Sequence, residues 1–203
     1  MKPKTPEIPI VTERLIIRCW RDEDRAPFAA MCADPLVMKF LPRILNRAES
    51  DAKIDSHVAD QQADGFCFWA LENRANGEFV GYAGLRRINY HAHFTPAVEI
   101  GWRLPVPFWG KGLASEAAKA CLTYGFETLN LPEIVAVTAP GNARSRAVMD
   151  RVGMTCKSAD DFIHPSLPPD HRLQPCVLYR SHAPSAASLM RAANPSFKQE
   201  LQP

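Results

Sequence analysis

The chain has 203 residues, 46% of them hydrophobic, so it can bury one sizeable core but is short for two ordinary domains. Lysine and arginine number 24 against 22 aspartate and glutamate, and the net charge of +2 gives no general reason to expect a nucleic acid partner. No apolar run approaches the about 18 residues of a membrane span, and the N-terminus lacks the apolar stretch of a signal peptide. We therefore expect one cytoplasmic domain with no membrane partner.

The first predicted elements are a strand and a short helix. Residues 1–10 form a proline-punctuated leader that we expect to be flexible. Residues 14–20 are rich in β-forming side chains and predict a strand. Asp22 can cap the helix that follows, which ends before Pro35, and residues 36–41 predict a further short turn of helix.

A mostly polar helix comes next. Asn46 is followed three residues later by Glu49, which is the pattern of a capping box and predicts a helix to about residue 62. Ile54 and Val58 are expected on its buried side.

A hairpin follows this helix. Two strands are predicted at 66–72 and 79–88, and the Asn76-Gly77 pair between them is a strong hairpin signal, so the strands should pair antiparallel. Residues 89–96 form a loop.

The loop after the hairpin contains His91 and His93, whose spacing can hold a metal ion, but no cysteine or acidic cluster nearby completes a ligand set. We expect no metal there and interpret the segment as a surface or substrate-facing loop. The six cysteines are scattered without a C-x-x-C pair, mostly among apolar neighbours, and are interpreted as reduced packing residues.

The centre of the chain is a strand that gives way to a glycine turn and a helix. Residues 98–103 alternate in character and predict a strand, which two following prolines end. Gly110 and Gly112 then precede helical spacing over residues 113–129. The free N–H groups of such a helix start can cradle an anion such as a diphosphate. A tight connection without a ligand would have the same sequence.

The C-terminal part completes a mixed sheet. Its predicted elements, in chain order, are a buried strand at 132–138, a helix begun by Asn142 and ended by Gly153, a strand from 154, a long loop over 160–175, a last strand at 176–181 and a flexible tail over 182–203. This order predicts an α/β sheet of mixed direction with helices on both faces.

Three motifs in this order resemble the GNAT superfamily of N-acetyltransferases, and within it the RimJ/RimL-like group of ribosomal-protein N-terminal acetyltransferases. The strand Glu99-Ile100-Gly101-Trp102 matches the group's E-I-G-Y/W strand, and Trp109-Gly110-Lys111-Gly112 matches its form of the family's cofactor turn. Asn142-x-x-Ser145 followed by Arg151-Val152-Gly153-Met154 matches the third motif. The resemblance spans residues 11–181 and implies a single-domain GNAT fold, with a mixed, mostly antiparallel sheet of about six or seven strands between helices.

The resemblance also implies that the protein uses acetyl-CoA as cosubstrate and acetylates a primary amine, either a small molecule or a protein N-terminus. A homodimer is a further family expectation. The strand end and the glycine turn are expected to hold acetyl-CoA through backbone groups, and Asn142 and Ser145 to approach its pantetheine arm. The cofactor-binding residues predicted in this way are Trp102, Arg103, Leu104, Trp109, Gly110, Lys111, Gly112, Leu113, Ala114, Asn142 and Ser145.

Glu99 and Ser145 are the predicted catalytic residues. Glu99 is placed to remove the amine proton, directly or through water, although it could instead only anchor a neighbouring loop. Many family members carry a tyrosine acid where this chain has Met149, which leaves Ser145, directly or through water, as the candidate proton donor to the thiolate. His91 or His93 is an alternative base.

Other functions are compatible with parts of the sequence. Gly110 and Gly112 approximate a dinucleotide-binding motif, but the next strand ends without the acidic residue that such a site needs. A P-loop is excluded because Gly112, and no serine or threonine, follows Lys111. A non-catalytic acyl-CoA-binding module stays open, and the ordered motifs argue against a purely structural protein.

Overall fold

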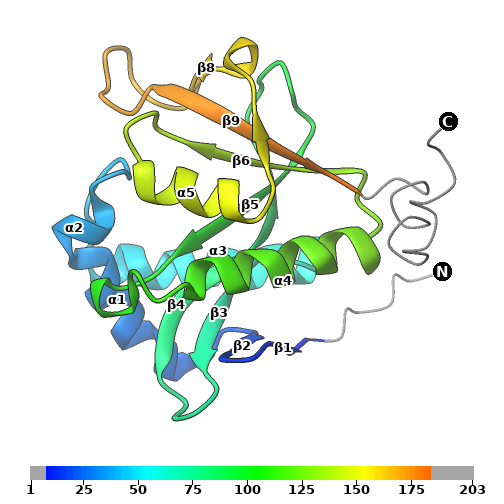
Figure 1. The fold of residues 1–203 in the computed structure, drawn as a ribbon. Coiled ribbons are helices and arrows are strands. Elements are labelled where there is room, and N and C mark those ends of the chain that lie inside the picture. The colour runs from blue at the N-terminus through cyan, green and yellow to red at the C-terminus, as the bar shows by residue number, and fades with distance from the viewer. Residues whose placement is uncertain (1–7, 184–203) are drawn as a thin grey trace, which may run out of the picture.

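The computed structural model describes residues 8–183, which form one sheet with helices on both of its faces (Figure 1). The longer strands are β2 (Leu15–Arg18), β3 (Phe68–Asn73), β4 (Phe79–Arg87), β5 (Val98–Arg103), β6 (Glu133–Thr138) and β9 (Pro175–His182). The two-residue strands are β1 (Ile10–Val11), β7 (Thr155–Cys156) and β8 (Phe162–Ile163). The helices are α1 (Arg25–Ala33), α2 (Pro35–Met38), α3 (Arg47–Asp64), α4 (Leu113–Glu127) and α5 (Ala143–Arg151), with short 3-10 turns η1 (Asp22–Asp24), η2 (Val106–Phe108) and η3 (Ser158–Asp160).

The sheet has the mixed direction that the sequence predicts. Its strand order is β1-β2-β3-β4-β5-β6-β9-β7, and β8 also pairs with β9. Within residues 8–183 every pair is antiparallel except β5 with β6. The nine strands exceed the six or seven expected because the two-residue strands are too short to leave a pattern in the sequence.

The sheet separates two apolar clusters. Alternate residues of a strand point to opposite faces, so Trp69 and Leu71 pack in the cluster beneath α4 while Phe68 and Ala70 pack in the cluster beneath α1 and α3. Figure 1 shows α4 and α5 on one side of the sheet, with α1 and α3 on the other.

Helix α3 begins as predicted but buries a different stripe. The Asn46 side chain accepts from the Glu49 N–H at 2.9 Å, and the Glu49 carboxylate accepts from the Asn46 N–H at 2.8 Å, which is the capping box. Ile54 is buried, but the prediction for Val58 is wrong, because its side chain is 36% exposed. The buried stripe runs through Ile54 and two polar residues, Ser50 and His57, which hydrophobic patterning passes over.

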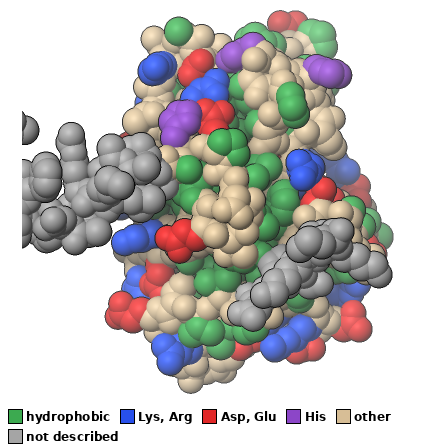
Figure 2. Space-filling view, turned by 90° about the vertical axis from the view of Figure 1, so that its right-hand side faces the viewer, with side chains coloured by type: hydrophobic (Ala, Val, Ile, Leu, Met, Phe, Trp, Pro, Cys, Tyr) green, Lys and Arg blue, Asp and Glu red, His purple; other side chains and the backbone are tan. Residues whose placement is uncertain are grey.

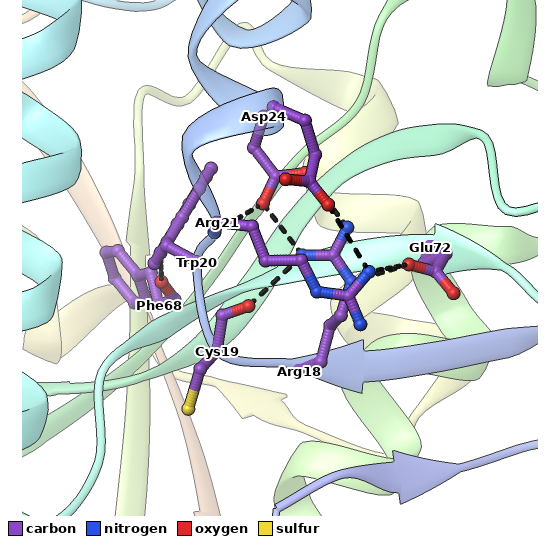
Figure 3. A network of polar contacts seen from close by, with 8 residues as sticks. Arg18, Cys19, Trp20, Arg21, Asp24, Phe68 and Glu72 are labelled. Atoms are coloured by element: carbon purple, nitrogen blue, oxygen red, sulfur yellow. Dashed lines mark hydrogen bonds and ion pairs between the residues drawn. The ribbon is translucent and has the colours of Figure 1, made fainter.

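The start of α1 is fixed by a buried ion-pair network and not by Asp22 (Figure 3). Asp22 opens the turn η1, and its side chain is exposed. Arg18 instead pairs with both oxygens of Asp24 at 2.7 and 2.9 Å and with Glu72 at 2.6 Å. Both Arg18 and Asp24 are at least 95% buried, so this network ties β2, β3 and the entry to α1 together.

Several smaller predictions differ from the structure. The loop expected over 160–175 contains β8, because two residues are enough to pair with the edge of β9. Cys19 and Cys156 are exposed, whereas the other four cysteines are buried. Strands β1 and β9 each extend one residue into the predicted leader and tail. Most of those two segments, residues 1–7 and 184–203, lies outside the described residues.

The surface charge, the polarity of the helices and the arrangement of possible metal ligands can be read from the described residues. Basic and acidic side chains are interspersed on the face shown in Figure 2, as a net charge of +2 suggests. No helix within residues 8–183 is long and apolar enough to span a membrane. The same residues contain no group of three or more histidine, cysteine or acidic side chains that could hold a metal ion.

Candidate active site

The parallel strands β5 and β6 meet at one point and then separate. Glu99 pairs with Val135, and no further pair joins the two strands in the described chain. Beyond this point β5 stays with β4 as far as Arg103, and β6 stays with β9 as far as Thr138. The sheet therefore opens beside the end of β5, the segment expected to hold acetyl-CoA through backbone groups, and the backbone edges that face the opening have no strand partner in the described chain.

The glycine turn lies on the α4 side of this opening. Gly110 and Gly112 have φ values of +74° and +77°, in the left-handed region that favours glycine. The first helical bond of α4 runs from the Glu116 N–H to the Gly112 carbonyl, so the N–H groups of residues 113–115 have no acceptor within the helix. The turn therefore has free donors at the positive end of a 15-residue helix, as an anion cradle requires.

Arg14 holds this turn from the neighbouring strand end. Its guanidinium donates to the Lys111 carbonyl at 2.8 Å and to the Glu116 carboxylate at 2.6 Å. Glu116 also accepts from the Thr12 hydroxyl at 2.6 Å. Burial would raise the pKa of Glu116, but the hydrogen bonds from Thr12 and Arg14 outweigh it and leave that pKa below its usual value. A fixed cation thus lies beside the cradle, and no local pattern around Arg14 indicates this.

Trp109 shapes the same turn. Its indole N–H donates to the Leu104 carbonyl at 2.7 Å, which links the turn to the end of β5. The Arg144 guanidinium, in the first turn of α5, lies 4.3 Å from the centroid of the indole ring. Trp109 therefore joins the starts of α4 and α5 and keeps a second cation, Arg144, near the opening.

Helix α5 begins at Asn142, as predicted. The side-chain Oδ1 of Asn142 accepts from the Ser145 N–H at 3.4 Å, and its side-chain Nδ2 donates to the Thr138 hydroxyl at 3.0 Å. Ser145 is half-buried near the end of β6. Met149, one turn further along, is 98% buried in the core beneath α4 and carries no proton to donate.

Glu99 lies on the opposite face of the sheet, at the vertex of the opening. Its side chain is 16% exposed and pairs with the Arg86 guanidinium at 2.9 Å. Burial raises the pKa of Glu99, and the positive charges of Arg86 and Lys53 offset only part of this rise. The next residue on this face is Gly101, where a Cβ would lie 2.8 Å from the Phe68 ring. Position 101 therefore requires glycine, because the Phe68 ring occupies the place of a side chain there.

The surroundings of Glu99 include groups that the sequence analysis did not single out. Lys53 and His57 come from α3, and Tyr90 comes from the loop between β4 and β5. His57 is fully buried among aromatic rings, and this burial lowers its pKa to about 3, so its imidazole is neutral at ordinary pH. The Tyr90 hydroxyl and the Arg86 Nε are buried without a partner in the described chain. His91 and His93 are exposed, and His93 lies 3.8 Å from Asp160.

A comparison with protein families identifies the group to which this site belongs. Residues 14–155 match the model of the acetyltransferase (GNAT) domain, which covers well over half of the chain. The chain belongs to the GNAT acetyltransferase family. This confirms the predicted family and single-domain fold, and the prediction of an acetyltransferase enzyme. The alternative of a dinucleotide-binding oxidoreductase is wrong, because the glycine turn of this acetyltransferase follows a GNAT strand and does not open a dinucleotide domain.

Individual relatives of this acetyltransferase agree with the assignment. It is 31% identical over 146 residues to YkkB of Bacillus subtilis, an alignment that covers 71% of this chain and 84% of YkkB. It is 39% identical over 130 residues to the FsC-acetyl coenzyme A-N(2)-transacetylase of Aspergillus fumigatus, covering 60% of this chain and 54% of that protein. An acetyltransferase structure from Agrobacterium tumefaciens superposes with a TM-score of 0.70 at 27% identity, covering 87% of this chain and 95% of that one.

The fold divides the predicted residues of the acetyltransferase between two sides of one opening. The glycine turn, Asn142 and Ser145 lie around the starts of α4 and α5, whereas Glu99 and the Arg103 side chain lie on the face that α1 and α3 cover. Their roles in binding and catalysis stay predictions. The sequence motifs identified groups that share a segment, and missed Arg14, Lys53 and Arg86, which reach the site from other elements.

Proposed function

We propose that this acetyltransferase moves the acetyl group of acetyl-CoA directly to a primary amine while both substrates are bound. The observation that carries the proposal is the single opening between β5 and β6, with two helix starts on one side and a buried carboxylate on the other. Such an opening can admit the cofactor from one face and the amine from the other, which brings the thioester and the nucleophile together.

The cofactor would be held mostly by backbone groups. The free N–H groups of the glycine turn and of Leu113 and Ala114 suit the diphosphate, with Arg14 and Lys111 supplying positive charge. The unpaired edge of β5 from Trp102 to Leu104 offers donors and acceptors to the amide-containing pantetheine arm. Asn142 keeps one amide hydrogen free for the same arm, since its other groups bind Thr138 and Ser145.

The proposed reaction forms one bond and breaks one. The neutral amine attacks the thioester carbonyl, the new C–N bond forms, and the C–S bond breaks to release the thiolate of CoA. Glu99 takes the proton from the amine, directly or through water, and its raised pKa makes it a better base than an ordinary surface carboxylate. A backbone N–H at the open edge of β5 would stabilise the oxyanion.

Ser145 is the proposed source of the proton that the thiolate receives, directly or through water. A thiol with a pKa near about 8.5 needs little help to leave at neutral pH, so loss of this hydroxyl should have a smaller effect than loss of Glu99. The replacement Ser145→Ala is therefore expected to lower kcat less than Glu99→Gln does.

The test begins with the melting temperature of the protein with saturating acetyl-CoA, and with NADH and ATP as controls. Ligand at about 100 times its Kd adds roughly 2.7 kcal/mol, a rise of about 5 to 10 °C for a chain of this size. A rise with acetyl-CoA alone, followed by amine-dependent thiol release, supports the proposal. No rise with acetyl-CoA, or a larger one with NADH, contradicts it. Binding without turnover for any amine would instead indicate a non-catalytic acyl-CoA-binding module.

A further inference from the structure

The face that would receive the amine contains an excess of positive charge. Lys53 of α3, Arg86 of β4 and Arg103 of β5 are all partly buried there. Glu99 pairs with Arg86, and Asp60 of α3 is the other carboxylate near Lys53. Neither Lys53 nor Arg103 forms an ion pair within residues 8–183.

Two of these cations are held side by side on a pair of aromatic rings. Phe68 and Tyr82 stack with their centroids 5.5 Å apart. The Arg86 guanidinium lies 5.3 Å from the centroid of Phe68, and the Arg103 guanidinium lies 5.2 Å from that of Tyr82. The rings fix both guanidinium groups on one platform, although like charges repel each other.

The Arg103 guanidinium donates only to weak acceptors within the described residues. Within the described residues its side chain contacts the Cys32 sulfur at 3.6 Å and the Met38 sulfur at 3.5 Å, and both are poor acceptors for a guanidinium with five N–H groups. On the same platform the Arg86 Nε is buried without a partner. Arg86 already pairs with Glu99, whereas the partly buried Arg103 has no carboxylate partner within residues 8–183, so a carboxylate ligand would satisfy its donors better than the two sulfur atoms do.

We infer that the amine acceptor also has a carboxylate, which binds the Arg103 guanidinium with Lys53 in support while its amine lies at Glu99. This inference rests on the proposed acetyl transfer and narrows its acceptor to amino acids. Glu99 and Arg103 are four residues apart on one face of β5, about 13 Å between Cα atoms before their side chains reach inward. The Phe68 ring lies over Gly101 between them, so a zwitterion that joins the two groups would cross this ring.

The same charges disfavour a polyamine acceptor. A polyamine brings several positive charges to a face that already holds Lys53, Arg86 and Arg103, whereas an amino acid brings one charge of each sign. A protein N-terminus lacks the carboxylate next to its amine. The charge pattern therefore selects among primary amines that would otherwise react alike.

The test compares each amino acid with its carboxamide, which lacks the negative charge and keeps the amine. Thiol release from acetyl-CoA by the full chain is measured with α- and ω-amino acids, with the carboxamide of each, and with spermidine. The amine of an α-amino acid amide is less basic and more of it is neutral, so intrinsic reactivity favours the amide. We expect at least one amino acid to exceed its amide in kcat/KM by about ten- to one-hundred-fold, the range of one charged hydrogen-bonded contact.

Variants of Arg103 and Lys53 then test whether these two side chains cause the preference for a carboxylate. Arg103→Gln should reduce the acid-to-amide ratio to near one, mainly through KM, and Arg103→Lys should restore part of it. Lys53→Gln gives a second variant if Arg103→Gln does not fold, and it should lower the ratio less. Arg87→Gln is the matched control, because Arg87 is the next residue on β4 but pairs with Asp64 at the surface, and its ratio should equal that of the wild type.

Failure of the inference can be told apart from failure of the proposed function. A wild-type preference for amides or spermidine, or an acid-to-amide ratio that survives both Arg103→Gln and Lys53→Gln, overturns the inference while acetyl transfer stands. Absence of amino acid acetylation in a protein that binds acetyl-CoA and acetylates other amines overturns it as well. No binding of acetyl-CoA and no thiol release overturns both.

Discussion

Replacement of Arg14 by alanine tests how the proposed cofactor turn is built. The change removes the hydrogen bond to the Lys111 carbonyl and the pairing with Glu116, together with a guanidinium that lies beside Gly112. The hydrogen bonds from the Thr12 hydroxyl and the backbone N–H of residue 14 to Glu116 are expected to remain. The turn should keep its shape in the folded protein while it loses a positive charge.

The expected magnitude follows from exposure. The Arg14 side chain is 46% exposed, so its ion pair should contribute no more than about 1 kcal/mol to the free energy of unfolding. A cation about 5 Å from a phosphate charge is worth about 1 kcal/mol in water and about 3 kcal/mol at the dielectric of a protein surface. Because Arg14 is so exposed, we expect a value in the lower part of this range, about 1 to 2 kcal/mol. The Kd for acetyl-CoA should therefore rise by about five- to thirty-fold.

Isothermal titration calorimetry with acetyl-CoA measures this Kd, at low and at high salt. Screening shortens the reach of the charge from about 10 Å at 0.1 M to about 3 Å at 1 M, so the difference between wild type and variant should shrink as salt rises. Arg74→Ala is the matched control, because Arg74 contacts the same loop through the Thr12 carbonyl and not the glycine turn. An unchanged Kd for Arg14→Ala, or an equal loss for Arg74→Ala, would refute the reasoning.

Three further predictions concern the other face and the core. Glu99 must be ionised to act as a base, and burial raises its pKa. The kcat/KM for acetyl transfer should therefore fall as the pH drops through this raised pKa, and Glu99→Gln should remove this pH dependence. Asp24→Asn leaves Glu72 as the one carboxylate that pairs with the buried Arg18 within the described residues. Urea unfolding should show that the free energy of unfolding falls by about 3 kcal/mol, and a fall of less than about 1 kcal/mol would contradict the role of this network. Gly101→Ala forces a Cβ against the Phe68 ring, and the same assay should show a loss of about 1 to 3 kcal/mol, with an unchanged midpoint as the contrary result.

Local patterns predicted several helix starts, including the two on the proposed cofactor side of the site. The capping box of Asn46 and Glu49 formed as expected, because both partners lie within one helical turn. The glycine turn and Asn142 likewise depend on neighbours in sequence. Such features are visible in the sequence because the groups that define them are only a few residues apart.

The proposed acceptor side could not be predicted in this way. Lys53, Arg86 and Arg103 come from three elements and meet only because α3 packs over β4 and β5. His57 occupies the buried stripe that hydrophobic patterning extended to Val58, since the helix turns a polar residue toward the aromatic cluster. A charge pattern that depends on tertiary packing leaves no spacing signal in one sequence.

Hydrogen exchange of the full chain with and without acetyl-CoA tests the central claim most directly, because it reports both binding and its location. We expect protection in three separate segments that border the opening: the end of β5 at residues 101–104, the turn and start of α4 at 110–116, and the start of α5 at 142–146. No protection, or protection confined to the groove that Ile10 and Val11 form with the outer side of α4, would contradict it.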